Sequence, residues 1–352
     1  MSRIVFLDTV SPLPYDTRSF NQRAVQGTEA SVMRIADRLG AWVMQHNRSS
    51  AWERYLPLQR LDAEHVVVIR DSRALAQARE LFPQAQLHLW LHDKIRPRSK
   101  RGRRLRRSAE LLRTARVSLI CVSDTQRRDV SNTLRWAGLG GLPLCTRYNP
   151  LDPALQPDDS VVDDRQLAFF ASPNKGLAFA LDAFGALHRA MPDLRLVVGN
   201  PGYKADARTR LPGVEFLGPQ PQALMHAHVR RSLCTFHPNF RIPETFGLVY
   251  AESHALGTPV LTHDFGAAAE IVADPRQLLP VKRAYLCYEA ALGAFAPRWR
   301  QMPARFAASV GLFDAYIERI REWRGGARPA VVPDPRFALD RLESQWRELL
   351  GA

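Results

Sequence analysis

Two glutamates, Glu244 and Glu252, lie eight positions apart in the segment PETFGLVYAESHALGTPVL, residues 243–261. Eight residues are slightly more than two helical turns, so both carboxylates would face one side of a continuous helix. Pro243 and Gly247 instead favour a helix that starts inside the segment, with Glu244 in the preceding loop and Glu252 in the first turns. Backbone N–H groups at a helix start attract phosphate. A carboxylate on each side of a bound diphosphate would accept hydrogen bonds from sugar hydroxyls, which outlines a nucleotide-sugar site.

The two acids also have a simpler interpretation. Charged side chains lie mostly on protein surfaces, so Glu252 could belong to a solvated helix face. Glu244 could be a first-turn acid that the helix dipole favours. The neighbouring residues must decide between the two interpretations.

The first half of the chain alternates short apolar runs with longer helical patterns, which is typical of parallel strands joined by crossover helices. We expect a helix over residues 31–43. The expected strands are RIVFLD (3–8), HVVVIR (65–70), QLHLWLHD (86–93), VSLICVS (117–123) and LCTRYN (144–149). The pattern predicts a doubly wound α/β domain over residues 1–150.

A Pro- and Asp-rich stretch, residues 151–166, is expected to be an exposed connection. A second α/β series follows. Its expected strands are 167–172, 194–200, 214–218, 232–238 and 259–264, and its expected helices are 177–191 and 247–256. This series predicts a second doubly wound, Rossmann-like domain over 151–334, followed by an amphipathic helix in 335–352. Two such domains would face a cleft, with ligands beyond the carboxyl ends of the strands.

The totals suit a two-domain soluble protein of 352 residues, with 46% hydrophobic and 24% charged residues. The N-terminus has no secretory pattern, and no apolar stretch approaches the about 20 residues of a spanning helix. We therefore expect a cytoplasmic protein. Its four cysteines, Cys121, Cys145, Cys234 and Cys287, are widely spaced, which predicts reduced and mostly buried thiols rather than disulfides or a zinc site.

The segment 243–261 resembles the signature of the family 4 retaining glycosyltransferases of the two-domain B-type fold, in which two glutamates are separated by seven residues and Phe-Gly follows the first. RAVQGTEASVMRIADRLG (23–40) is similar to the glycine-rich first loop and helix of that family. FFASPNKGLAFALDAF (169–184) looks like its Ser-Pro-Asn-basic-Gly-Leu element. The resemblance extends over nearly the whole chain, and the acid pair is its most specific part.

The resemblance implies roles for individual residues of the second domain. Glu244 would bind hydroxyls of the donor sugar, and Glu252 would bind the ribose. Lys175 would neutralise the diphosphate as it leaves, because negative charge grows there in the transition state. The diphosphate itself would be held by the backbone at Phe246, Gly247 and Leu248.

The resemblance also implies roles for residues whose neighbours match the family pattern less fully. Gly27 would let the backbone approach the donor phosphate, although Gln26 stands where the family commonly has a second glycine. The family often has an arginine upstream of the Lys-Gly step, which this chain lacks. Either Lys175 would then carry the diphosphate charge alone, or Ser172 would help it by hydrogen bonding. His92 resembles the histidine that the family points at the reacting sugar, and His92 and Asp93 would contact donor or acceptor.

A strongly basic run follows directly. The chain has a net charge of +14, and nine of the fourteen residues from Lys94 to Arg107 are Lys or Arg, with no acid among them. The run could be a solvated face, an anionic membrane or glycan contact, or a nucleic-acid contact. No aromatic residues interleave with these arginines, so we favour a membrane surface or an anionic acceptor and expect no nucleic acid. The residues assigned to this acceptor or membrane side are Asp93, Lys94, Arg96, Arg98, Lys100, Arg101, Arg103 and Arg104.

The sequence and the resemblance together predict a retaining glycosyltransferase that moves a sugar from a nucleoside diphosphate sugar to a hydroxyl acceptor. The acceptor would be a glycan or glycolipid in surface-polysaccharide, lipopolysaccharide or glycolipid assembly. We expect no metal and no cofactor besides the co-substrate, and a location in the cytoplasm or on the inner face of the membrane. The alternative is a non-catalytic binding protein that uses the same fold and its basic face to hold an anionic polymer or a membrane surface.

Overall fold

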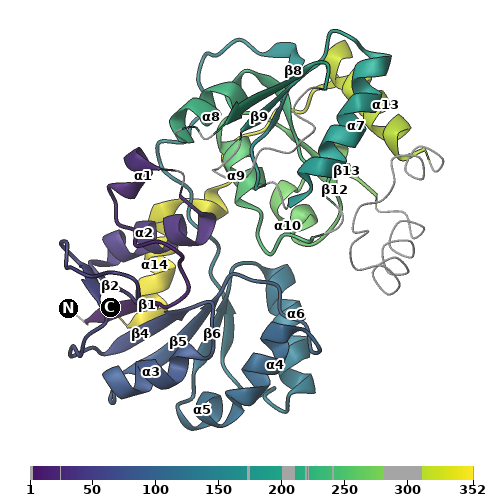
Figure 1. The fold of residues 1–352 in the computed structure, drawn as a ribbon. Coiled ribbons are helices and arrows are strands. Elements are labelled where there is room, and N and C mark those ends of the chain that lie inside the picture. The colour runs from purple at the N-terminus through teal and green to yellow at the C-terminus, as the bar shows by residue number, and fades with distance from the viewer. Residues whose placement is uncertain are drawn as a thin grey trace. The chain divides into compact units, whose positions relative to one another are not determined.

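The computed structural model describes residues 3–23, 25–172, 175–199, 211–218, 220, 222–239, 242–280 and 311–351. The chain forms two compact units (Figure 1). Unit 1 comprises 1–21, 25–153 and 335–352, and unit 2 comprises 22–24 and 154–334. The C-terminal segment therefore belongs to the first unit.

The described strands of unit 1 form one parallel sheet with the order β3-β2-β1-β4-β5-β6-β7. These strands are β1 (Ile4–Asp8), β2 (Trp42–Gln45), β3 (Tyr55–Pro57), β4 (His65–Ile69), β5 (Gln86–Leu91), β6 (Ser118–Cys121) and β7 (Leu144–Thr146). The order reverses between β1 and β4. Ligands of open parallel sheets bind beyond the carboxyl ends of the strands at such a reversal.

Helices cover both faces of this sheet, as parallel sheets require. The described helices of unit 1 are α1 (Ser19–Gln22), α2 (Gly27–Leu39), α3 (Ala74–Leu81), α4 (Lys100–Arg107), α5 (Ala109–Thr114), α6 (Asp124–Trp136), the 3₁₀ turn Pro335–Phe337 and α14 (Leu339–Leu350). Helix α14 lies beside α2 (Figure 1), and its Trp346 contacts Phe6 of β1 and Trp90 of β5. Because side chains alternate along a strand, Val66 and Val68 face the other layer, where Leu105 and Leu112 pack.

Unit 2 repeats this architecture, with the strand order β10-β9-β8-β11-β12-β13 among its described residues. Its strands are β8 (Asp163–Phe169), β9 (Arg195–Gly199), β10 (Val214–Gly218), β11 (Ser232–Phe236), β12 (Val260–His263) and β13 (Leu278–Leu279). Its helices are α7 (Leu177–Ala190), α8 (Gln222–Arg230), α9 (Leu248–Ala255), α10 (Ala268–Val272), the 3₁₀ turn Pro275–Gln277, α13 (Leu312–Glu322) and the π turn Trp323–Ala327. Here the order reverses between β8 and β11.

The predicted fold class, doubly wound parallel α/β, is confirmed. Two local expectations were wrong. The helix expected over 31–43 begins at Gly27 and ends at Leu39, and Trp42–Gln45 forms β2 instead. The connection expected over 151–166 is shorter, because β8 begins at Asp163 and pairs with Ser232 there.

The cysteine prediction is met where the structure describes the residues. Cys121 and Cys234 are buried free thiols, and Cys145 is a partly buried one. Burial raises the pKa of all three thiols, which keeps them protonated. Cys287 lies outside the described residues.

Candidate functional site

An ion pair occupies the place in unit 2 where its strand order reverses. Lys175 follows β8, Glu244 follows β11, and these two strands are neighbours in the sheet. The Lys175 Nζ and Glu244 Oε2 atoms are 2.5 Å apart. The sequence-predicted residues Lys175 and Glu244 therefore come together at the carboxyl ends of adjacent strands, although 69 positions separate them in the chain.

The carboxylate of Glu244 is buried, with 8% of the residue exposed, whereas the Lys175 side chain remains 33% exposed. A buried carboxylate needs a compensating charge, which Lys175 supplies. Of the two side chains in the ion pair, Lys175 is the more accessible to solvent. An incoming anion would therefore meet the lysine rather than the glutamate.

The backbone around Glu244 is fixed by a close contact with Gly266. The Ala267 N–H donates to the Glu244 carbonyl at 3.0 Å, and Glu244 and Gly266 form a parallel bridge. Gly266 has a φ of +69°, and a Cβ there would lie 2.7 Å from the Glu244 carbonyl oxygen and 2.7 Å from the Pro243 Cβ. Only glycine permits this approach, so Gly266 positions the loop that carries Glu244.

His237 lies beside the ion pair at the end of β11. Its Nε2 is 3.8 Å from Glu244 Oε1, its ring stacks on Phe169, and Tyr250 meets it edge-on. His237 is 1% exposed, and neither ring nitrogen has a hydrogen-bond partner among the described residues. Burial lowers the pKa of His237 to about 4, so the ring is neutral near pH 7 and can donate one hydrogen bond and accept another.

Helix α9 begins immediately after the loop of Glu244. Its N-cap, Gly247, has a φ of +92° and supplies no side-chain cap. The Tyr250 N–H donates to the Gly247 carbonyl at 2.9 Å, which by helix geometry leaves the N–H groups of Leu248 and Val249 without intrahelical acceptors. A Cβ on Gly247 would lie 2.4 Å from the Tyr250 ring, which shows how closely the backbone packs there. Such a helix start attracts anions.

Glu252 lies on α9 and is 8% exposed, so it does not belong to a solvated face. The Gln222 side-chain amide donates to its Oε1 at 3.4 Å. The surface interpretation of the two glutamates is therefore wrong for both, since Glu244 is equally buried.

The residue next to Glu252 ties α9 to the sheet. The Ser253 hydroxyl donates to the Thr258 carbonyl at 2.7 Å and bonds to the Thr235 hydroxyl of β11 at 2.7 Å. Ser253 and Thr235 are fully buried. This network fixes the rotation of α9 and with it the direction of the neighbouring Glu252.

Sequence reasoning missed His237, Gly266 and Ser253. His237 had a usable signal, because it ends the expected strand 232–238 on the ligand-binding edge. Gly266 and Ser253 had none, since a turn glycine and a helix serine are common. Their contacts depend on which strands become neighbours.

Of the other predicted residues, Ser172 belongs to the turn of Lys175, and Gly27 and His92 belong to unit 1. The Ser172 carbonyl accepts from the Lys175 N–H at 2.8 Å, which shapes the lysine's turn. Gly27 is the exposed first residue of α2 in unit 1. His92, also in unit 1, packs its ring 4.5 Å from that of Trp90, and burial lowers its pKa to about 3. The roles implied for these residues stay predictions, as does the absence of a metal.

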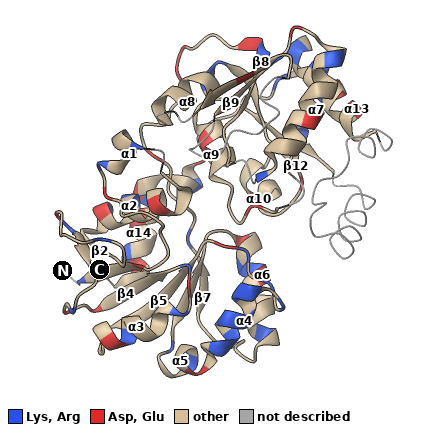
Figure 2. Cartoon of the chain, in the orientation of Figure 1, with Lys and Arg blue, Asp and Glu red and all other residues tan. Residues whose placement is uncertain are grey.

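The basic run forms the loop after β5 and helix α4, where blue colour gathers in Figure 2. Asp93 is held by Arg70 and Arg101, Arg104 pairs with Asp71, and Lys94 pairs with Asp129. The remaining basic residues of the run are exposed: Arg96, Arg98, Lys100, Arg103, Arg106 and Arg107. In the part of the chain that the structure describes, no helix has the length and apolar character needed to cross a bilayer.

Comparison with known proteins connects unit 2 to glycosyl transfer. Residues 169–284 match the family model for group 1 glycosyl transferases. A stretch of 112 residues is 30% identical to the phosphatidyl-myo-inositol mannosyltransferase of Mycobacterium leprae and spans 31% of this chain and 30% of that protein.

Solved structures resemble the whole chain. HepE from Anabaena, in complex with UDP and glucose, has a TM-score of 0.67 at 16% identity over 100% of both chains. Sucrose-phosphate synthase from Thermosynechococcus elongatus has a TM-score of 0.58 at 15% identity, over 99% of this chain and 98% of that one. The chain thus has the two-domain B-type fold of these glycosyltransferases, and its match to the glycosyl transferase family lies on the unit that carries Lys175, Glu244 and Glu252.

Proposed function

We propose that this protein is a retaining, metal-independent glycosyltransferase that moves a sugar from a nucleoside diphosphate sugar to a hydroxyl acceptor. The observation that carries the proposal is the Lys175–Glu244 ion pair at the strand reversal of unit 2, directly before the uncapped start of α9. A cation, a buried carboxylate and open N–H groups together suit a sugar diphosphate.

Donor binding rearranges the ion pair. The diphosphate lies at the start of α9 and draws the exposed Lys175 to its oxygens, since a lysine acts as a mobile point charge for phosphate. Glu244 then accepts hydrogen bonds from the sugar hydroxyls in place of the lysine. Neutral His237, 3.8 Å from Glu244, donates to the carboxylate or to the sugar.

Glu252 binds the ribose. Its place favours this role, because a carboxylate on the helix that begins at the anion-attracting start can accept hydrogen bonds from ribose hydroxyls. Gln222 at the start of α8 donates to the same carboxylate and holds it in place. Because the rotation of α9 is fixed, the Glu252 carboxylate points in one direction and binds the ribose in one position.

During transfer, the bond between the anomeric carbon and the diphosphate oxygen breaks, and a bond from that carbon to the acceptor oxygen forms. Lys175 stabilises the charge that grows on the leaving diphosphate. The acceptor hydroxyl is the nucleophile, and its proton passes to a diphosphate oxygen, so no protein base is required. Retention of configuration follows from the family resemblance.

The acceptor is a glycan or glycolipid of surface-polysaccharide assembly, reached on the cytoplasmic face of the membrane. The basic face of unit 1 supports this assignment, since six of its exposed cations have no carboxylate partner in the described residues: Arg96, Arg98, Lys100, Arg103, Arg106 and Arg107. Trp136, 43% exposed, lies under Arg106 and adds an amphipathic side chain to that face.

The test is a screen of UDP-, GDP- and ADP-sugars for hydrolysis and transfer. We expect turnover of one donor class and its loss in Glu244→Ala and Lys175→Met. Donor hydrolysis should persist in Arg103→Glu, because Arg103 is exposed on α4 and is not among the residues assigned to the donor. The competing binding protein predicts the reverse. It would turn over no donor and would lose polyanion binding in Arg103→Glu.

A further inference from the structure

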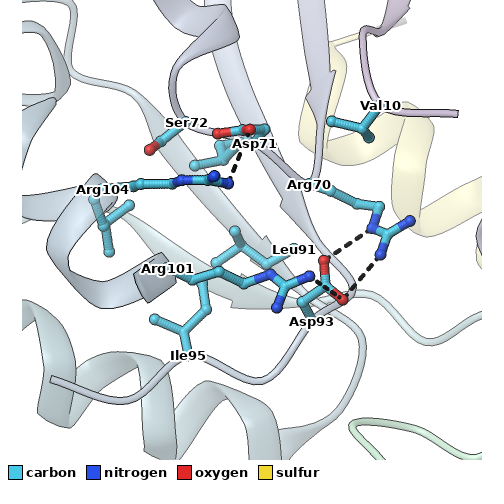
Figure 3. A pocket seen from close by; sticks show the side chains of 11 residues that line it. Val10, Arg70, Asp71, Ser72, Leu91, Asp93, Ile95, Arg101 and Arg104 are labelled. Atoms are coloured by element: carbon cyan, nitrogen blue, oxygen red, sulfur yellow. Dashed lines mark hydrogen bonds and ion pairs between the residues drawn. The ribbon is translucent and has the colours of Figure 1, made fainter. Parts of the chain in front are cut away.

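A small charged pocket lies in unit 1, and its lining includes none of the residues assigned to the donor (Figure 3). It follows β4 and β5 and includes Val10 after β1, so it lies where the strand order of unit 1 reverses. Leu89 and Leu91 of β5 and Leu105 of α4 form its apolar floor. Its charged lining consists of Arg70, Asp71, Asp93, Arg101 and Arg104.

Each carboxylate of this pocket already has an arginine of its own. Arg70 donates from Nε and Nη2 to the two oxygens of Asp93 at 2.9 and 3.0 Å. Arg73, outside the pocket, donates from Nε and Nη2 to Asp71 Oδ2 at 2.9 and 2.6 Å. These two-nitrogen contacts are the strong form of the arginine–carboxylate pair. The negative charges of Asp71 and Asp93 are therefore already balanced by Arg73 and Arg70.

Arg101 and Arg104 add two further positive charges to the same pocket. Arg101 Nη2 lies 3.0 Å from Asp93 Oδ1, and Arg104 Nη1 lies 3.3 Å from Asp71 Oδ2. A guanidinium has five N–H donors, so one such contact leaves most of them available. The two residues are three apart on α4 and lie on one helix face. The pocket lining thus holds three guanidiniums and two carboxylates, an excess of one positive charge, and Arg73 outside the pocket adds another beside Asp71.

Backbone strain marks the same place. Arg70 has a φ of +65°, in the left-handed region that a bulky side chain rarely adopts. Such strain clusters at ligand sites. The negative charges of Asp8 and Glu29 also act on Arg70, but neither residue lines the pocket, and both belong to the surroundings of Arg70 rather than of Arg101 and Arg104.

We propose that this pocket binds a phosphate group of the acceptor through Arg101 and Arg104, with the Ser72 hydroxyl as an additional donor. The inference rests on the proposed function in assigning the phosphate to the acceptor. The pocket volume of about 120 Å³ is well below the roughly 300 Å³ at which sites for whole small molecules begin, so it suits a single group. Paired guanidiniums match the oxygens of phosphate.

The experiment titrates inorganic phosphate into the full-length protein at low ionic strength and follows binding by ³¹P NMR. We expect Arg101→Gln/Arg104→Gln to weaken binding about tenfold or more, since it removes two charge-assisted contacts. Arg113→Gln/Arg116→Gln removes the same charge from exposed positions of unit 1 outside the basic run and should stay within about twofold of wild type. Lys175→Met should retain the phosphate binding that Arg101 and Arg104 supply.

Equal weakening in both arginine double variants would overturn the proposal, because only diffuse charge would then act. Loss of binding in Lys175→Met would also overturn it, because the phosphate would then occupy the donor site. Stabilisation by UDP, GDP or ADP is measured on the same samples. If a nucleoside diphosphate stabilises the protein while the phosphate result fails, the pocket inference falls and the proposed function stands.

Co-sedimentation with lipid vesicles shows whether the bound phosphate belongs to a lipid or to a soluble acceptor. A lipid-borne phosphate predicts that Arg101→Gln/Arg104→Gln, but not the Arg113/Arg116 control, loses co-sedimentation with phosphatidylglycerol vesicles, with phosphatidylcholine vesicles as the blank. A phosphorylated soluble acceptor predicts that both variants sediment alike while only the first loses phosphate binding.

Discussion

Replacing Gly266 by alanine should displace Glu244 without touching any ligand. Gly218 provides a matched control, because its φ of +66° is close to the +69° of Gly266 while a Cβ there meets nothing within 4 Å. Both substitutions incur the left-handed backbone cost of about 1–2 kcal/mol. Gly266→Ala adds overpacking against the backbone of Glu244, about 1–3 kcal/mol more.

The assay compares thermal unfolding and donor turnover of the two variants. The added cost corresponds to several degrees of Tm, at about 2–4 °C per kcal/mol for a unit of this size. Turnover should fall about tenfold or more in Gly266→Ala only, because small displacements of a substrate-positioning group are costly. Equal stability and wild-type turnover in both variants would refute the role of Gly266 in positioning Glu244.

Three further outcomes follow from the contacts of unit 2. Lys175→Met leaves the Glu244 carboxylate buried without its ion pair and should lower the free energy of unfolding, measured in urea, by about 1–3 kcal/mol. This loss is smaller than that for breaking a fully buried ion pair, because Lys175 is 33% exposed. The double variant Lys175→Met/Glu244→Gln should recover most of the loss. The pKa of His237 is about 4 when folded and about 6.5 when unfolded, so the unfolded state binds more protons between these values and stability falls as pH drops from 6.5 to 4. His237→Phe should reduce this loss of stability between pH 6.5 and 4 by up to about 3 kcal/mol, as measured by urea unfolding at several pH values. An unchanged dependence of the unfolding free energy on pH would contradict a buried neutral ring. Ser253→Ala should cost about 1–2 kcal/mol and weaken nucleoside diphosphate binding, whereas unaltered binding would show that the network does not orient α9.

The sequence predicted the longer elements well, because strands such as His65–Ile69 are continuous apolar runs and helices such as Leu177–Ala190 are long enough to show their period. It failed at short strands. Trp42–Gln45 has only four residues and follows α2 after a two-residue turn, so its apolar residues looked like the end of the helix. Tyr55–Pro57 and Leu278–Leu279 are too short to show any period.

The acids of the candidate site could be predicted from their spacing and from the family resemblance. Their pairing could not be derived from local patterns, because Lys175 meets Glu244 only when β8 and β11 become neighbours. The unpartnered ring of His237 likewise depends on what packs around it, and Gly266 matters only through its contact with the backbone of Glu244. Such residues carry no local signature.

Binding of a nucleoside diphosphate to unit 2 through Glu252 is the central claim, and thermal stabilisation tests it most directly. With UDP, GDP or ADP at about 100 times the Kd, the wild-type protein should gain about 2.7 kcal/mol, and Glu252→Ala should lose most of that gain. Stabilisation by none of the three nucleotides, or equal stabilisation of wild type and Glu252→Ala, would contradict the account.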